Sequence, residues 1–82
     1  MSVQSIERAF ALLRALATAP YGVTELADQV ELPKSTVARL LSALETEGAV
    51  AQDELGGEYR LGDGLLDIAG AAQSSIPVNA ET

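Results

Sequence analysis

Residues 32–41 read LPKSTVARLL, and this stretch decides the fold. Pro33 suits the first position of a helix, where its missing N–H leaves no bond unmade. Gly48 is typical of the residue that follows a helix. The pattern therefore predicts a helix over about 34–47. Four apolar residues recur on one face of it and are expected to be core: Val37, Leu40, Leu41 and Leu44.

The opposite face of this helix is small and polar. Its only charge is positive, because the acidic residues of the segment come in the last turn. An ordinary solvated surface is the plain interpretation of such a face, and a binding surface is the alternative. The face is formed by Ser35, Ala38, Arg39 and Ser42.

Two other helices are expected before this one. The first covers about 3–18 and ends at the turn over 20–22. Thr24 is a natural N-cap for a short second helix of about seven residues, which a tight turn at Glu31 connects to the helix at Lys34. Exposed parts of the apolar stripe on the first helix would suit a dimer surface. The stripe contains Val3, Ile6, Phe10, Leu13 and Ala17.

The hydrophobic pattern changes from helical to alternating after Gly48. Segments 50–52 and 59–61 are predicted to be two short strands, joined by a hairpin loop over 53–57. Arg60 should point outward, because it alternates with apolar neighbours. A weak final helix is expected from Leu65, and the chain divides into a domain over 1–70 and a linker or frayed tail over 71–82.

Composition limits the possible functions. The chain has 82 residues and a net charge of −7, with neither Cys nor His. It therefore has no thiolate zinc site, no cysteine nucleophile and no histidine base, and we expect no catalytic residue, cofactor or metal and no enzymatic activity. The start lacks a signal-peptide pattern, and no apolar run is long enough to cross a membrane, so a cytoplasmic protein is expected.

The net charge of −7 argues against a nucleic-acid partner until its distribution is considered. Residues 1–44 carry four basic and four acidic residues and are neutral, whereas 45–82 carry one base, Arg60, and eight acids. The whole acidic excess therefore lies in the hairpin, the final helix and the tail. The expected partner is double-stranded DNA, bound with modest affinity by one domain, so that a dimer is needed.

The order of elements predicts the fold class. Helix, short helix, tight turn, longer helix and β-hairpin make a mainly α domain with a small hairpin, which is a winged helix-turn-helix. In that motif the second helix of the pair enters the major groove. Arg39 can donate to guanine in a bidentate manner, and Ser35 or Thr36 can donate to bases or phosphates unless they cap the helix. The predicted DNA-binding residues are Thr24, Lys34, Ser35, Thr36, Ala38, Arg39, Ser42 and Arg60.

Five segments together resemble one known family. They are 3–9 (VQSIERA), 26–27 (LA), 32–41 (LPKSTVARLL), 59–62 (YRLG) and 65–66 (LL). This pattern is similar to the DNA-binding domain of IclR-type transcriptional regulators. The resemblance implies a winged helix-turn-helix that binds operator DNA as a homodimer. It also implies a larger domain that binds a small-molecule effector through residues that this chain does not contain.

Three residues or segments depart from the family pattern. Glu31 stands where many relatives have Gly, and a left-handed backbone there would cost on the order of 1 kcal/mol. Ala38 stands where many relatives have an aromatic residue or His, so it offers only methyl contact. The hairpin is acidic, so Arg60 either contacts a phosphate or pairs with Asp53 or Glu58. A winged helix that docks on protein, or a mixed-dimer module that does not bind DNA itself, is the alternative function.

Overall fold

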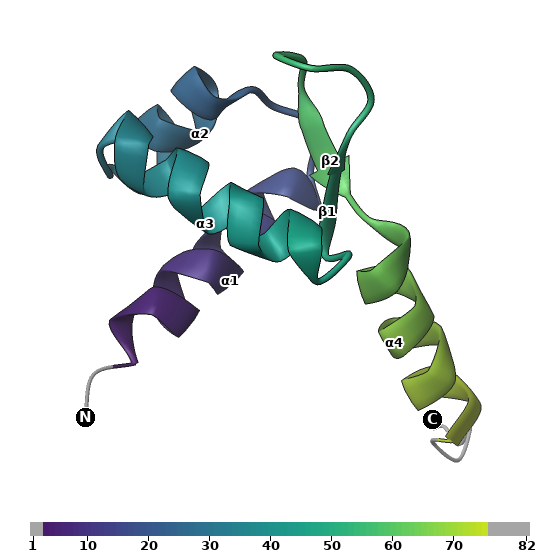
Figure 1. Ribbon diagram of the computed structural model, residues 1–82. Coiled ribbons are helices and arrows are strands. Elements are labelled where there is room, and N and C mark those ends of the chain that lie inside the picture. The colour runs from purple at the N-terminus through teal and green to yellow at the C-terminus, as the bar shows by residue number, and fades with distance from the viewer. Residues whose placement is uncertain (1–2, 76–82) are drawn as a thin grey trace.

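The computed structural model describes residues 3–75 and confirms the predicted order of elements (Figure 1). Three helices are followed by an antiparallel hairpin and a fourth helix. Their bounds are α1 Gln4–Leu16, α2 Val23–Val30, α3 Lys34–Thr46, β1 Val50–Gln52, β2 Tyr59–Leu61 and α4 Asp63–Ser75. The domain is therefore a winged helix-turn-helix, in which α2 and α3 form the helix pair and the hairpin forms the wing.

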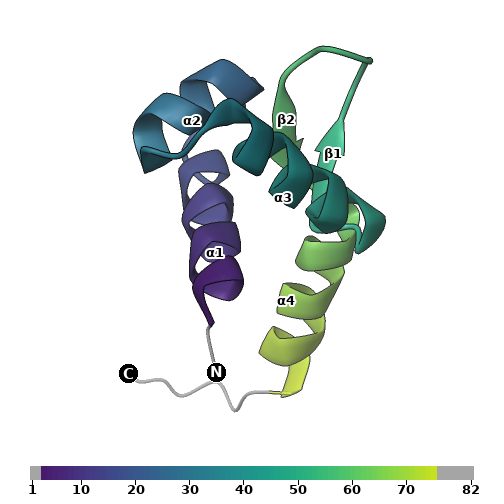
Figure 2. The same cartoon turned by 60° about the vertical axis from the view of Figure 1, so that its left-hand side comes forward.

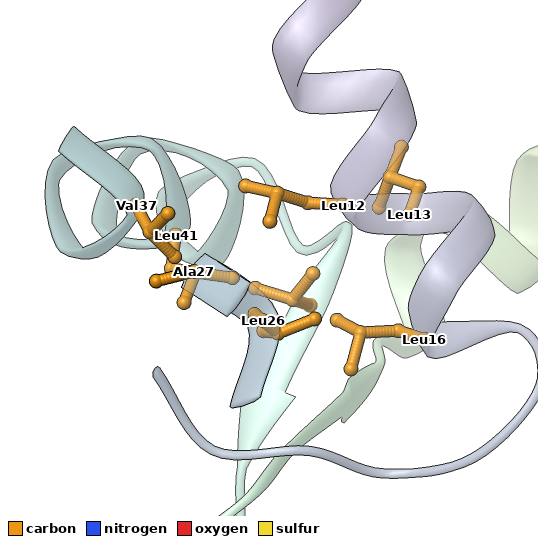
Figure 3. Packing of buried hydrophobic residues seen from close by; sticks show 8 residues of the cluster. Leu12, Leu13, Leu16, Leu26, Ala27, Val37 and Leu41 are labelled. Atoms are coloured by element: carbon orange, nitrogen blue, oxygen red, sulfur yellow. The ribbon is translucent and has the colours of Figure 1, made fainter. Parts of the chain in front are cut away.

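One small core joins α1, α2, α3 and β1 (Figure 3). Two of the four predicted core residues of α3, Val37 and Leu41, are fully buried, and Leu40 and Leu44 are half-buried against the same cluster. Since α3 is fixed on this side, its other side is left to solvent. The buried residues are Leu12, Leu13, Leu16, Leu26, Ala27, Val37, Leu41 and Val50.

The wing has the predicted strands and side-chain alternation. Val50 pairs with Leu61 and Gln52 with Tyr59, and these side chains lie on the face nearer the core. Arg60 pairs with Ala51 and points outward, as expected. The backbone of Tyr59 also exchanges two hydrogen bonds with Tyr21, of 2.8 and 3.2 Å, which attaches the α1–α2 connection to the edge of the wing.

The N-cap of α2 lies two positions before the predicted one, and the start of α3 differs from the prediction by one position. Gly22, and not Thr24, is the N-cap of α2. The Glu25 carboxylate accepts a 2.8 Å hydrogen bond from the Gly22 N–H, which satisfies the N-cap donor and leaves Thr24 in the first turn. Pro33 is the N-cap of α3, with ψ of 146°, and does not occupy its first helical position.

A residue with a left-handed backbone follows both α2 and α3. Glu31 ends α2 with φ 59° and ψ 47°, so the strained conformation suspected from the sequence is present. Gly48 follows α3 with φ 79°, and its N–H and that of Ala49 donate to the carbonyls of Glu45 and Leu44. These two bonds form a Schellman motif, which confirms the predicted role of Gly48.

The fourth helix starts earlier and ends later than expected. It begins at Asp63, so Gly64 and Gly70 lie within it, and it continues through Ser75 into the stretch expected to be a tail. The rest of that stretch, 76–82, lies outside the described residues. Only the base of α4 is attached: Gly62 donates to Ala49 and Leu65 to Gly48, while residues 66–73 are exposed.

Candidate nucleic-acid interface

The outer side of α3 presents the residues expected to bind DNA. Lys34, Ser35, Ala38, Arg39 and Ser42 are all exposed, and Thr36 is half-buried. Positions 35, 39 and 42 lie on one face because they are separated by four and three residues. The core contacts of Val37 and Leu41 on the other side hold this face in place.

The cations of this face are free to meet an anionic partner. Neither Lys34 nor Arg39 makes an ion pair with any residue in 3–75, and no acidic residue occurs in α3 before Glu45. The surface thus combines two unpaired positive charges with small side chains. Such a surface can approach a groove lined by phosphates without electrostatic repulsion.

The start of α3 has backbone donors without a side-chain cap. The N-cap is Pro33, and no side chain hydrogen-bonds to the first-turn N–H groups. Capping by Ser35 or Thr36, which the sequence left open, does not occur, because both residues already lie within the helix. The side chains of Ser35 and Thr36 remain available to a ligand. The N–H groups of the first turn point out of the N-terminal end of α3, where a bound phosphate is favourable.

Thr24 and Arg60 flank α3 from two different elements. Thr24 is exposed in the first turn of α2, and Arg60 is exposed on β2. In Figures 1 and 2, α3 runs between α2 and the wing, so the eight predicted residues are distributed over three neighbouring elements. Six of the eight share one helix, and the other two lie at its flanks.

Arg60 already has partners within the protein. Its Nε donates to Asp53 Oδ1 at 2.9 Å, and its Nη1 approaches the Leu61 carbonyl oxygen at 3.4 Å. Of the two carboxylates that the sequence offered, the structure selects Asp53 and not Glu58. This is the only salt bridge among residues 3–75.

Sequence reasoning did not anticipate how much apolar surface stays uncovered. Val3, the N-cap of α1, and Ile6 and Phe10 within α1 are 49–59% exposed, and Leu66 and Ile68 of α4 are 52% and 68% exposed. The helical spacing of these residues was visible, but the sequence does not show which parts of an amphipathic helix find a neighbour. The guanidinium of Arg14 lies 5.9 Å from the centre of the Phe10 ring, and Phe10 remains 49% exposed beside it.

Other kinds of site find no support in the described part of the chain. No three side chains of the metal-binding types gather within residues 3–75. No helix there has the length and apolar character needed to cross a membrane.

Comparison with known proteins confirms the resemblance. Residues 5–54 match the family model described as the IclR helix-turn-helix domain. The chain is 42% identical over 67 residues to the glycerol operon regulatory protein of Streptomyces coelicolor, covering 79% of this chain and 26% of that protein. It is 40% identical over 76 residues to the HTH-type transcriptional regulator TtgV of Pseudomonas putida, covering 90% of this chain and 29% of that protein.

Solved structures agree with the sequence relatives. An IclR family transcriptional regulator from Brucella abortus superposes with a TM-score of 0.79 at 33% identity, over 93% of this chain and 30% of that one. Pseudomonas aeruginosa HmgR gives a TM-score of 0.77 at 36% identity, over 93% and 32%. The chain thus spans less than a third of the length of these relatives. Its sequence and its fold place it among transcriptional regulators and not among enzymes: the chain belongs to the IclR family and forms the winged helix-turn-helix DNA-binding domain of that family.

Proposed function

We propose that the chain binds operator DNA as a homodimer, with α3 of each copy in the major groove. The observation that carries this proposal is the exposed face of α3, where Lys34 and Arg39 have no acidic partner within residues 3–75. A recognition helix needs such a face, because an acidic side chain at the start of the helix would repel the phosphates on both sides of the groove.

Within this proposal the residues divide between base reading and phosphate binding. Arg39 donates to guanine, Ser35 and Ser42 bond to base edges, and Ala38 contacts a thymine methyl group. Phosphates are held by residues at the rim of the interface and by the amides of the first turn of α3. The rim residues are Thr24, Lys34, Thr36 and Arg60.

The dimer follows from charge and exposed surface together. One neutral helix-turn-helix half neutralises few phosphates, so two copies on a near-palindromic site are needed for useful affinity. Ile6 and Phe10 lie exposed on one face of α1 and Val3 is exposed at its N-cap, and a second copy would cover this stripe. Figures 1 and 2 both show α1 extending away from α2 and from the wing loop, so pairing there leaves α3 accessible.

A DNA titration with matched variants tests the proposal. Labelled duplexes from the region upstream of the protein's own gene are titrated at about 50 and about 200 mM salt. We expect selective binding that weakens as salt rises, and loss of selectivity in Arg39→Ala, because the guanine contact disappears. Arg8→Ala removes the same charge from α1 and should retain selectivity. Equal binding by Arg39→Ala and the unmodified chain would exclude α3 as the reading helix.

The regulatory role extends beyond these 82 residues. A small-molecule effector would act through the part of the longer relatives that these 82 residues do not match. We place the protein with its DNA in the cytoplasm.

A mixed-dimer or protein-docking module is the second candidate. It is favoured by the exposed Leu66 and Ile68 of α4 and by the acidity of residues 45–82, which suit a protein surface better than a duplex. Absence of DNA binding at low salt, together with intact self-association, would support this candidate over the first.

A further inference from the structure

The wing depends on one residue for its attraction to DNA. Arg60 is the only Lys or Arg in residues 45–82. Three carboxylates lie in the same hairpin, on Asp53, Glu54 and Glu58, and all three residues are exposed. Any charged contact between the wing and a phosphate must therefore come from Arg60, against the repulsion of its neighbours.

The hairpin register places Asp53 where it engages that one cation. Arg60 is paired across the strands with Ala51, and Asp53 follows two residues after Ala51, so the two side chains emerge on the same outward face. The Nε–Oδ1 distance of 2.9 Å is that of a charge-assisted hydrogen bond. The guanidinium thus has a carboxylate partner before any DNA arrives.

We propose that Asp53 limits the DNA affinity of this domain by competing with the phosphate backbone for Arg60. This inference rests on the proposed DNA-binding function. If Arg60 stays with Asp53 in the complex, the wing contributes no cation. If Arg60 moves to a phosphate, Asp53 is left as an unpaired negative charge beside the duplex. In both arrangements Asp53 weakens binding, because it either keeps Arg60 from the phosphate or loses its pairing with Arg60 when the complex forms.

Asp53 and a phosphate compete for Arg60 closely enough that the effect on DNA affinity can be measured. The Arg60 and Asp53 side chains are 47% and 74% exposed, so water screens their attraction and the pair is weak. A phosphate can therefore displace Asp53. Removing its charge should tighten binding about two- to fivefold for each wing, which matches the strength of an exposed ion pair.

A matched pair of variants separates this effect from simple charge removal. Asp53→Asn and Glu54→Gln each remove one negative charge from the same loop, but only Asp53 pairs with Arg60. The chain is titrated with a labelled duplex of arbitrary sequence of about 30 base pairs, three helical turns, over a series of salt concentrations. We expect tighter binding by Asp53→Asn, with a log–log salt slope steeper by about 0.9 per released wing, and a smaller change in Glu54→Gln.

Arg60 itself supplies the decisive comparison. Arg60→Gln in the Asp53→Asn background should abolish the gain in affinity and in salt slope, because the cation for which Asp53 competes is then missing. Equal gains from Asp53→Asn and Glu54→Gln, or a gain that survives Arg60→Gln, would overturn the inference while leaving the proposed function intact. If neither the unmodified chain nor Asp53→Asn binds DNA at low salt, both the inference and the proposed function fail.

Discussion

Glu31 is the only non-glycine residue with a positive φ among residues 3–75. It lies in the turn between α2 and α3, where its own N–H and that of Leu32 both donate to the Ala27 carbonyl. Those bonds close the C-terminal end of α2 and set the direction in which the chain leaves it toward α3. The side chain of Glu31 is exposed, and it makes no hydrogen bond within residues 3–75 that would offset the strain of its backbone.

Glu31→Gly should stabilise the domain. The left-handed backbone costs a residue with a Cβ about 1–2 kcal/mol, and the added freedom of glycine in the unfolded chain offsets part of the gain. We expect a net gain of about 0.5–1 kcal/mol, measured as a higher urea midpoint at unchanged m-value. Glu31→Ala retains the Cβ and should show no gain. A similar gain in both variants would mean that the carboxylate, and not the backbone, causes the instability.

At this scale the sequence predicted which side chains would be exposed on α3, because helical periodicity alone separates Arg39 from Leu41. It could not choose between Asp53 and Glu58 as the partner of Arg60. Alternation puts both carboxylates on the face of Arg60, and only the three-dimensional structure shows that Asp53, from across the hairpin, is the one that pairs with it. The roles of individual residues in DNA binding stay predictions.

At the scale of elements, glycines determine how the wing and α4 meet. Gly62 is buried, and a Cβ on it would overlap the Gly48 carbonyl oxygen. A Cβ on Gly64 would lie 2.8 Å from the same oxygen. From the sequence pattern, these glycines are predicted to interrupt the chain before a helix that starts at Leu65. Their actual role is close backbone approach, which appears only when Gly48 and Gly62 are brought together by the hairpin.

Two glycine-to-alanine substitutions should therefore have opposite effects. Gly62→Ala should destabilise the domain by about 1–3 kcal/mol, because the backbone of Gly48 must move. Gly70→Ala has open space around the new methyl group and should stabilise α4 by about 0.5–1 kcal/mol. Thermal unfolding checks the first, and helical circular dichroism and amide exchange of residues 66–75 check the second. A neutral Gly62→Ala would show that the contact relaxes freely.

The positions at which helices begin are predicted less accurately from the sequence than the helices themselves. The pattern placed the N-cap of α2 at Thr24 and put Pro33 at the first helical position of α3, whereas Gly22 and Pro33 are the N-caps in the structure. For α2 the cause is Glu25, whose carboxylate reaches the Gly22 N–H and favours a helix that starts at Val23. A glycine three residues before a glutamate was a readable signal for this, but Thr24 offered a more familiar cap.

At the scale of the whole molecule, two helices extend beyond the core. The buried residues of α1 are all at its C-terminal end, from Leu12 to Leu16, and residues 66–73 of α4 are exposed. The sequence could not predict this, since the apolar stripe of α1 is continuous and only the lengths of α2 and α3 decide how much of it is covered. The uncovered part is the surface that we assign to the second copy.

Substitution of Ile6 tests that assignment without touching the core. Ile6 is 59% exposed, so Ile6→Asp should leave the fold intact but place a charge in the dimer contact. We expect weaker self-association by analytical ultracentrifugation and weaker binding to palindromic DNA. Ser5→Asp adds the same charge on a neighbouring face of α1 and should behave like the unmodified chain. Identical sedimentation of both variants and the unmodified chain would place the dimer contact elsewhere.

The attachment of α4 at its base has a mechanical consequence. The helix has 13 residues and is therefore about 20 Å long. Its hydrogen bonds to the body, from Gly62 to Ala49 and from Leu65 to Gly48, lie at one end and next to the wing (Figure 2). The helix is thus a lever whose pivot is the glycine contact: a rotation of about 10° at the pivot displaces the far end by roughly 3 Å. Force applied at the far end of α4 is therefore delivered to the junction where Gly48 and Ala49 connect the end of α3 to the hairpin.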